Sequence, residues 1–147
     1  PLRRLSEGRR RTQSRGGLRS VSPARPFVRH PRESDEYYFA EGCHILETWN
    51  QDTDPAVSLA RARVAPGATT RVHRLQGIAE RYLILAGSGR VEVEGLEPST
   101  VGPGDLVYIP PGCHQRITNT GRGDLLFLAV CTPRFLSDAY VHVESAT

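Results

Sequence analysis

The chain has 147 residues, of which 38% are hydrophobic, and both values suit one small domain. No run of about 18 apolar residues is present, so the sequence predicts no transmembrane helix. Cys43, Cys113 and Cys131 form no CxxC pair, which favours a reducing compartment, and we expect a cytoplasmic protein. All 19 basic residues are arginine and methionine is absent, a codon bias that indicates a GC-rich, bacterial coding sequence.

The net charge of +3 is the sum of two segments of opposite charge. Residues 1–32 hold ten arginines and one glutamate, a formal charge of +9, whereas residues 33–147 carry a formal charge of −6. Residues 1–35 are rich in Arg, Ser, Gly and Pro and cannot bury enough apolar surface to offset the entropy lost on ordering. We therefore predict a disordered basic tail over residues 1–35 and a folded, acidic domain over residues 36–147.

Three interpretations of this tail are open. Clustered arginines can bind nucleic acid or an acidic partner by counterion release, but no aromatic residues interleave with them for base stacking. The Arg-rich, acid-poor composition is also similar to that of an organelle transit peptide. We favour the third interpretation, a linker or an over-extended start, and so do not expect nucleic acid as a partner.

From Tyr37 onward, short apolar runs alternate with turn signals rich in Gly and Pro. The predicted strands cover residues 43–49, 57–64, 69–75, 80–86, 89–94, 106–109, 114–119 and 125–131, and residues 135–143 are expected to add a short helix or strand. Short strands at this regular spacing predict an all-β sandwich or small barrel. Residues 83–85 and 125–130 are apolar on both faces, so either a dimer partner or a packed loop should cover the second face. Of the two, we expect a homodimer.

His73 and Glu80 are the first candidate site residues. Gly77 lies between them, so the segment reads as a hairpin in which His73 ends one strand and Glu80 begins the next. Because side chains alternate between faces, Arg71 shares a face with His73, and Tyr82 shares one with Glu80. If both faces point inward, an imidazole and a carboxylate converge, and this donor pair suits Zn, Fe(II), Mn, Ni or Cu.

Residues 67–87 and 104–119 resemble the two motifs of the cupin superfamily. The positions that match in type and spacing are Gly67, His73, Glu80, Gly87, Gly104, Pro110, Gly112 and Asn119. The resemblance implies a cupin jelly roll, which is a double-stranded β-helix barrel, holding one divalent transition metal and a small-molecule ligand. Cupins include dioxygenases, isomerases, lyases and decarboxylases, so the resemblance implies no single reaction.

Two positions that carry histidine in the cupin motifs carry Leu75 and Gln115 here. In one interpretation, His73, Glu80 and Gln115 hold the metal, and water completes its coordination. In a second, a bulge in the preceding turn lets His114 reach the metal in place of Gln115. In the third, no metal binds, and the pocket either receives a ligand or acts as an acid–base site.

Three further residues are candidates for contact with a substrate. Arg71 would attract an anionic group if it points inward, and Tyr82 and Tyr108 could orient a ligand through their hydroxyls. The leading hypothesis is a mononuclear metal-dependent enzyme of the oxygenase, isomerase or lyase type, acting on a small oxygenated or carboxylated substrate. The alternatives are a non-enzymatic ligand-binding or sensing module without metal, and metal-free acid–base catalysis with His73 as the base, assisted by Glu80 or Tyr82.

Overall fold

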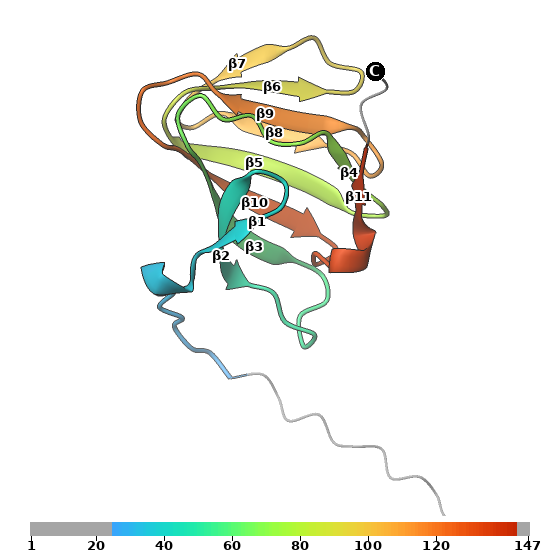
Figure 1. Ribbon diagram of the computed structural model, residues 1–147. Helices are drawn as coiled ribbons and strands as arrows, with labels where there is room; N and C mark the ends of the chain where they lie inside the picture. Colours follow the sequence, from blue (N-terminus) through green and yellow to red (C-terminus); the bar gives the residue numbers. More distant parts are fainter. Residues whose placement is uncertain (1–24, 144–147) are drawn as a thin grey trace, which may run out of the picture.

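The computed structural model describes residues 25–143, which form two antiparallel sheets that face each other (Figure 1). The strands are β1 (Tyr37–Phe39), β2 (Cys43–Trp49), β3 (Ser58–Val64), β4 (His73–Leu75), β5 (Ala79–Ala86), β6 (Gly89–Val93), β7 (Ser99–Val101), β8 (Leu106–Ile109), β9 (Gln115–Asn119), β10 (Leu125–Thr132) and β11 (Tyr140–His142). The larger sheet has the order β1-β2-β3-β10-β5-β8, and the smaller one has the order β11-β4-β9-β6-β7. The prediction of an all-β jelly roll is therefore confirmed.

Each of the eight predicted strands is present, and most end within one residue of the prediction. The exception is the segment predicted over residues 69–75, where only β4 is a strand and Thr69 makes a single bridge to Thr118. Strands β1 and β7 were not predicted, because three residues are too few for an alternating pattern to be recognised. Residues 135–143 form both expected elements, a 3-10 turn (Ser137–Ala139) followed by β11.

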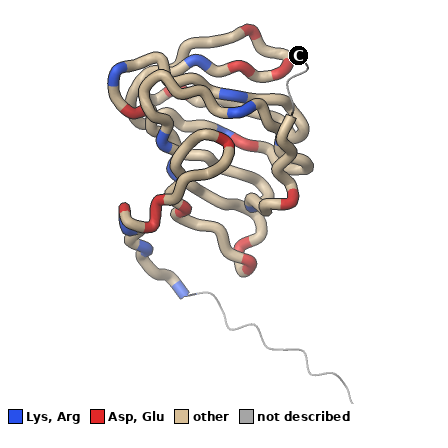
Figure 2. Tube along the Cα trace, viewed as in Figure 1, with Lys and Arg blue, Asp and Glu red and all other residues tan. Residues whose placement is uncertain are grey.

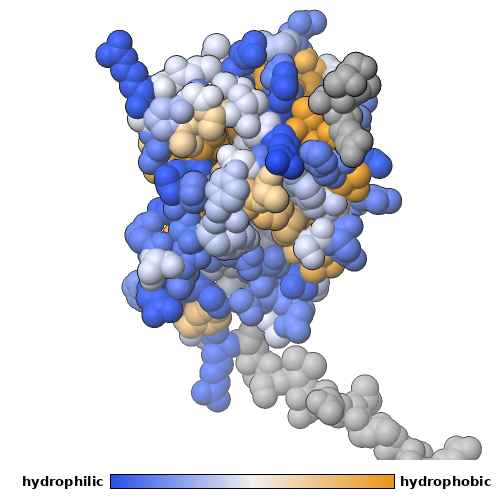
Figure 3. All heavy atoms as spheres, in the orientation of Figure 1, coloured by the Kyte–Doolittle hydropathy of each residue, from blue (hydrophilic) through white to orange (hydrophobic). Residues whose placement is uncertain are grey.

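The inward side chains of both sheets form one apolar core. Its most deeply buried members are Val64, Ile84, Val91, Ile109, Ile117, Leu125 and Phe127. The face shown in Figure 3 is mainly hydrophilic, with apolar side chains gathered in a few patches. Within residues 25–143, no helix is long and apolar enough to cross a membrane.

The segment that enters the barrel, residues 25–36, is held by ion pairs to the outer face of β3. Arg61 Nη2 lies 2.6 Å from Glu33 Oε2, and Arg63 Nη2 lies 2.6 Å from Glu36 Oε1. Figure 2 shows acidic and basic positions next to each other where this segment meets the barrel. Residues 25–35 of the predicted tail thus contact the domain, whereas the predicted disorder of residues 1–24 falls outside the described residues.

Asn119, at the end of β9, joins three segments at one end of the barrel. Its side chain is almost fully buried, and its amide nitrogen donates to the carbonyl oxygens of Val64 and Gly123 at 2.8 Å each. Its Oδ1 accepts from the backbone N–H of Gly121 at 2.9 Å. Gly87 packs at the same end with φ +85°, and a Cβ there would lie 2.6 Å from the carbonyl oxygen of Asp124. Both motif positions therefore have a structural role at the end of the barrel.

Replacing Asn119 with alanine should destabilise the barrel, because three backbone groups, among them the buried carbonyl of Val64, would lose their partner. We expect the free energy of unfolding to fall by about 2–4 kcal/mol, measured by urea denaturation. Thr118→Ala is the matched control, since it removes only a hydroxyl that bonds Thr69 on the exposed face. Equal losses in the two variants would contradict the role assigned to Asn119.

Candidate functional site

Four of the residues singled out in the sequence point into the barrel. His73 on β4 and Gln115 on β9 are paired in register in the smaller sheet, and both are at most 2% exposed. Glu80 and Tyr82 come from the inward face of β5 in the larger sheet, where they are 8% and 3% exposed. The alternation of side chains along these strands therefore brings both sheets' polar residues to one centre.

Hydrogen bonds through Gln115 connect this centre. The Tyr82 hydroxyl donates to Gln115 Oε1 at 2.5 Å, and Gln115 Nε2 donates to Glu80 Oε1 at 2.9 Å. The Cys131 thiol donates to the other Glu80 oxygen at 3.5 Å. Burial raises the pKa of the Glu80 carboxyl and that of the Tyr82 hydroxyl. These residues consequently form a closed, hydrogen-bonded network inside the barrel.

His73 has one defined tautomer. Its Nδ1 lies 2.8 Å from the carbonyl oxygen of Arg71, and a carbonyl only accepts, so Nδ1 carries the proton. Burial lowers the pKa of His73, and the ring stacks on Tyr140 with centroids 5.0 Å apart. Nε2 is therefore unprotonated, and it lies 3.7 Å from a carboxylate oxygen of Glu41.

Glu41, in the turn between β1 and β2, is a site residue that the sequence did not reveal. The residue is only 9% exposed, and within residues 25–143 its carboxylate receives no hydrogen bond, since His73 is beyond hydrogen-bond distance. Burial, with a smaller contribution from Glu80, raises the pKa of Glu41 from 4.5 to about 8. At neutral pH this carboxyl group is therefore mostly protonated. In the sequence, the only local feature that marks Glu41 is its position between an aromatic segment and Gly42, and glycine is common in turns.

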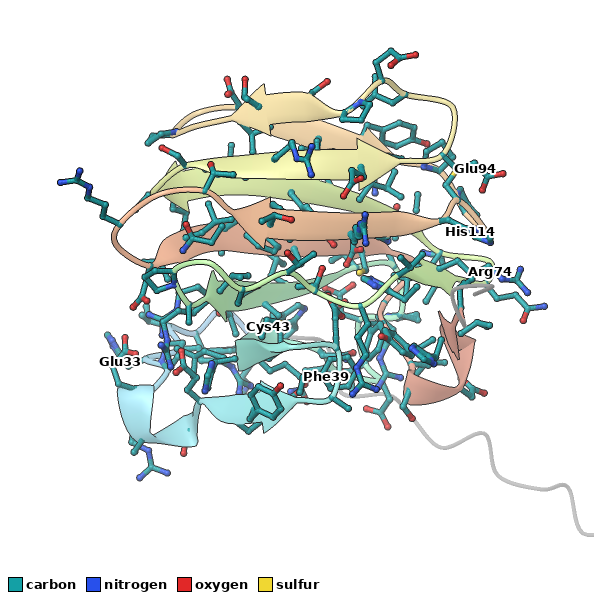
Figure 4. The ribbon with its side chains drawn as sticks, turned by 45° about the horizontal axis from the view of Figure 1, so that its top comes forward. Glu33, Phe39, Cys43, Arg74, Glu94 and His114 are labelled. Atoms are coloured by element: carbon teal, nitrogen blue, oxygen red, sulfur yellow. The ribbon has the colours of Figure 1, made fainter. Side chains whose placement is uncertain are left out.

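A cavity of about 70 Å³ opens beside Glu41, between the inner faces of β1, β2, β3 and β10. Its lining includes Tyr37, Phe39, Glu41, Glu47, Cys131 and Phe135. Figure 4 shows Phe39 near Cys43, its partner in the β1–β2 register. Through Cys131, the cavity adjoins the buried network around Glu80.

Three of the predicted site residues lie away from the interior. His114 is exposed, with its backbone N–H donating to Glu94, and Figure 4 shows it beside Glu94 and Arg74 at the edge of the barrel. The bulge that would bring His114 inward is absent, since β9 runs regularly from Gln115. Tyr108 is 54% exposed on the outer face of β8, and Arg71 is exposed just before β4.

The contacts at the centre differ from those expected of a metal site. Gln115 directs its Nε2 toward Glu80, and its oxygen already accepts from Tyr82. The free nitrogen of His73 faces Glu41. In the described part of the chain, no three His, Cys, Asp or Glu side chains are grouped so that they could hold a metal ion.

Comparison with known proteins identifies the family. Residues 60–131 match the profile of the cupin domain. Over 71 residues, the chain is 37% identical to the oxalate-binding protein of Thermotoga maritima, in an alignment that covers 48% of this chain and 58% of that protein. The chain thus spans less than two thirds of this relative. With the jelly-roll fold, these matches show that the chain belongs to the cupin superfamily.

Two solved structures illustrate the likeness in fold. One is described as a predicted oxalate decarboxylase from Thermotoga maritima; it is 25% identical, with a TM-score of 0.63 over 71% of this chain and 99% of that one. The other is the nucleoside dehydratase Pac13 of Streptomyces, which is 16% identical, with a TM-score of 0.65 over 82% of this chain and 95% of that one. The second likeness concerns the fold alone.

The buried Glu41 should make stability depend on pH. Its folded pKa of about 8 lies above its ordinary value of 4.5, so the folded state holds a proton that the unfolded state releases between these values. The free energy of unfolding should therefore fall as pH rises from about 5 to 8. Glu41→Gln should remove roughly 2–4 kcal/mol of this decline, as measured by urea denaturation across that range.

Glu97→Gln is the control for this measurement, because Glu97 is exposed in the turn after β6. Its pH profile should overlay that of the unmodified protein. A Glu41→Gln profile as steep as the unmodified one would show that Glu41 does not retain its proton in the folded state.

Proposed function

We propose that this protein binds a small molecule in the cavity beside Glu41 and exchanges a proton with it through Glu41 and His73. The observation that carries the proposal is the buried Glu41 carboxyl group, which lines the cavity and lies 3.7 Å from the free nitrogen of His73. This is the metal-independent alternative among the functions considered from the sequence. The metal-dependent hypothesis is less well supported, because Gln115 uses both ends of its amide within the protein.

The two residues would have complementary protonation states at neutral pH. The pKa of Glu41 is raised to about 8, so its carboxyl group can donate a proton to a ligand atom in the cavity. Burial lowers the pKa of His73, and Nε2 can accept a proton while Nδ1 stays bonded to Arg71. A pair of groups with pKa values displaced in this way is suited to acid–base chemistry. Glu41 lines the cavity and would contact the ligand directly. His73 does not line the cavity, so it would exchange a proton with Glu41 and not with the ligand itself.

A module that binds its ligand without reaction is the second candidate. It is favoured by the closed network of Tyr82, Gln115 and Glu80, none of which lines the cavity. In either case the ligand is small. The name of the Thermotoga relative makes oxalate the first carboxylated compound to test.

The test is isothermal calorimetry on chelator-treated protein with sodium oxalate, 1-propanol and propylammonium chloride as probes. For a charged probe that binds, the measured heat should differ between phosphate and Tris buffers, because a proton is taken up or released. Glu41→Gln should abolish this difference, and Glu97→Gln should preserve it. Binding that is lost on chelation and restored by one divalent metal would replace the proposal with the metal-dependent hypothesis.

We also propose that two copies of the chain pair through the outer face of the larger sheet. Leu83 on β5 lies in register with Leu106 on β8 and with Leu128 on β10. Leu83 and Leu106 are 37% and 64% exposed, and Tyr108 extends the same face. A contiguous apolar face that can meet its own copy across a twofold axis is suited to a homodimer.

Light scattering after gel filtration should therefore give twice the 16.2 kDa mass of one chain. Leu83→Glu should yield a monomer, because it buries a charge at the centre of the pairing face. Leu136→Glu, at an exposed leucine outside the two sheets, should leave the dimer intact. A monomeric unmodified protein at high micromolar concentration would refute this pairing.

A further inference from the structure

The cavity beside Glu41 combines carboxylates with aromatic rings, and we propose that it recognises a small primary or quaternary ammonium group of the ligand. This inference rests on the proposed function, since it concerns the same cavity. It departs from the carboxylated substrate expected from the sequence.

The charges around the cavity favour a cation. Its lining carries two acidic residues, Glu41 and Glu47, and no Lys, Arg or His is among the described residues that line it. Of the arginines in the neighbouring segments, Arg61 pairs with glutamates outside the barrel. Arg134 does not line the cavity, and its Nε donates at 2.7 Å to Asn50, which does. An anionic group entering the cavity would thus meet carboxyl groups without an opposing charge.

The Glu41 carboxylate in particular lacks a positive partner. It is nine-tenths buried, lines the cavity, and receives no hydrogen bond from residues 25–143. A buried carboxylate is stable only when it is paired or protonated. The raised pKa of Glu41 is consistent with the second state. When an ammonium group enters the cavity, Glu41 releases this proton to the solvent and pairs with the cation as a carboxylate.

Aromatic rings supply the rest of the recognition surface. Tyr37, Phe39 and Phe135 line the cavity, and Phe39 is held edge-to-face on Tyr140 with ring centroids 5.2 Å apart. Aromatic faces attract ammonium groups, and alkylated ammonium groups in particular bind among several rings. A carboxylate and three rings around one cavity therefore match both the charge and the apolar substituents of such a group.

The size of the cavity limits the group that it can hold. One water needs about 10–15 Å³ of such space, so a volume of about 70 Å³ accommodates roughly five water-sized groups. A trimethylammonium or propylammonium group is of this size. A nucleoside or a sugar is larger and would have to leave most of its atoms outside.

The test compares propylammonium chloride with its neutral counterpart 1-propanol, and with tetramethylammonium chloride and sodium oxalate, at equal ionic strength. Amide chemical shifts of the full chain should move around Glu41, Phe39 and Cys131 with both ammonium salts. Propylammonium should bind at least about tenfold more tightly than propanol, as expected for one charge pair supported by aromatic contacts. Equal affinity for propanol and propylammonium, or tighter binding of oxalate, would overturn the inference.

Variants separate the contributions of the two acids. Glu41→Gln should weaken propylammonium about tenfold and leave propanol unchanged, whereas Glu97→Gln should change neither. Glu47→Gln, at an exposed position where folding is not at risk, should weaken propylammonium by a smaller factor. Unchanged ammonium affinity in both cavity variants would contradict the role assigned to these acids.

The same spectra separate this inference from the proposed function. If oxalate moves the cavity resonances and the ammonium salts do not, the cavity binds a ligand and only the ammonium assignment fails. If no probe moves those resonances, both proposals fail.

Discussion

The amide of Gln115 is the contact on which the interior of this barrel depends. Buried polar groups must find partners inside the protein, and a buried carboxyl group without one costs several kcal/mol. Gln115 on β9 meets this requirement for Tyr82 and Glu80 on the facing sheet by accepting from one and donating to the other. Cys131 completes the contacts of Glu80. Within residues 25–143, the carboxyl group of Glu41, beside the cavity, receives no hydrogen bond.

Much of this interior could be predicted from the sequence, because strand alternation determines it. The spacing of His73 and Glu80 around Gly77 predicted two strands whose inward faces converge, and these residues do line the interior. The spacing does not determine how an amide is oriented. Whether Gln115 presents oxygen or nitrogen to Glu80 depends on Tyr82, which lies two residues further along β5 and donates to the amide oxygen.

For the predicted site residues that lie outside the interior, the alternation of side chains along a strand does not predict which positions are buried. All four residues of β8 are apolar or aromatic, so the sequence does not distinguish the buried Val107 and Ile109 from the exposed Tyr108. Arg71 precedes the first residue of β4, where alternation no longer applies. Glu41 lies in a turn next to a three-residue strand, and so short a strand carries no recognisable period.

The location of the cavity bears on which ligand the protein takes. The match to the cupin domain covers residues 60–131, but Tyr37, Phe39, Glu41 and Glu47 precede this segment, and Phe135 follows it. The part of the chain that defines the family therefore builds the barrel, while residues outside it supply both acidic groups and all the aromatic rings of the cavity. Relatives with the same barrel can differ in these flanking segments, and can therefore bind different ligands. For this reason the charge and ring content of the cavity are better guides to its ligand than the names of proteins that share the fold.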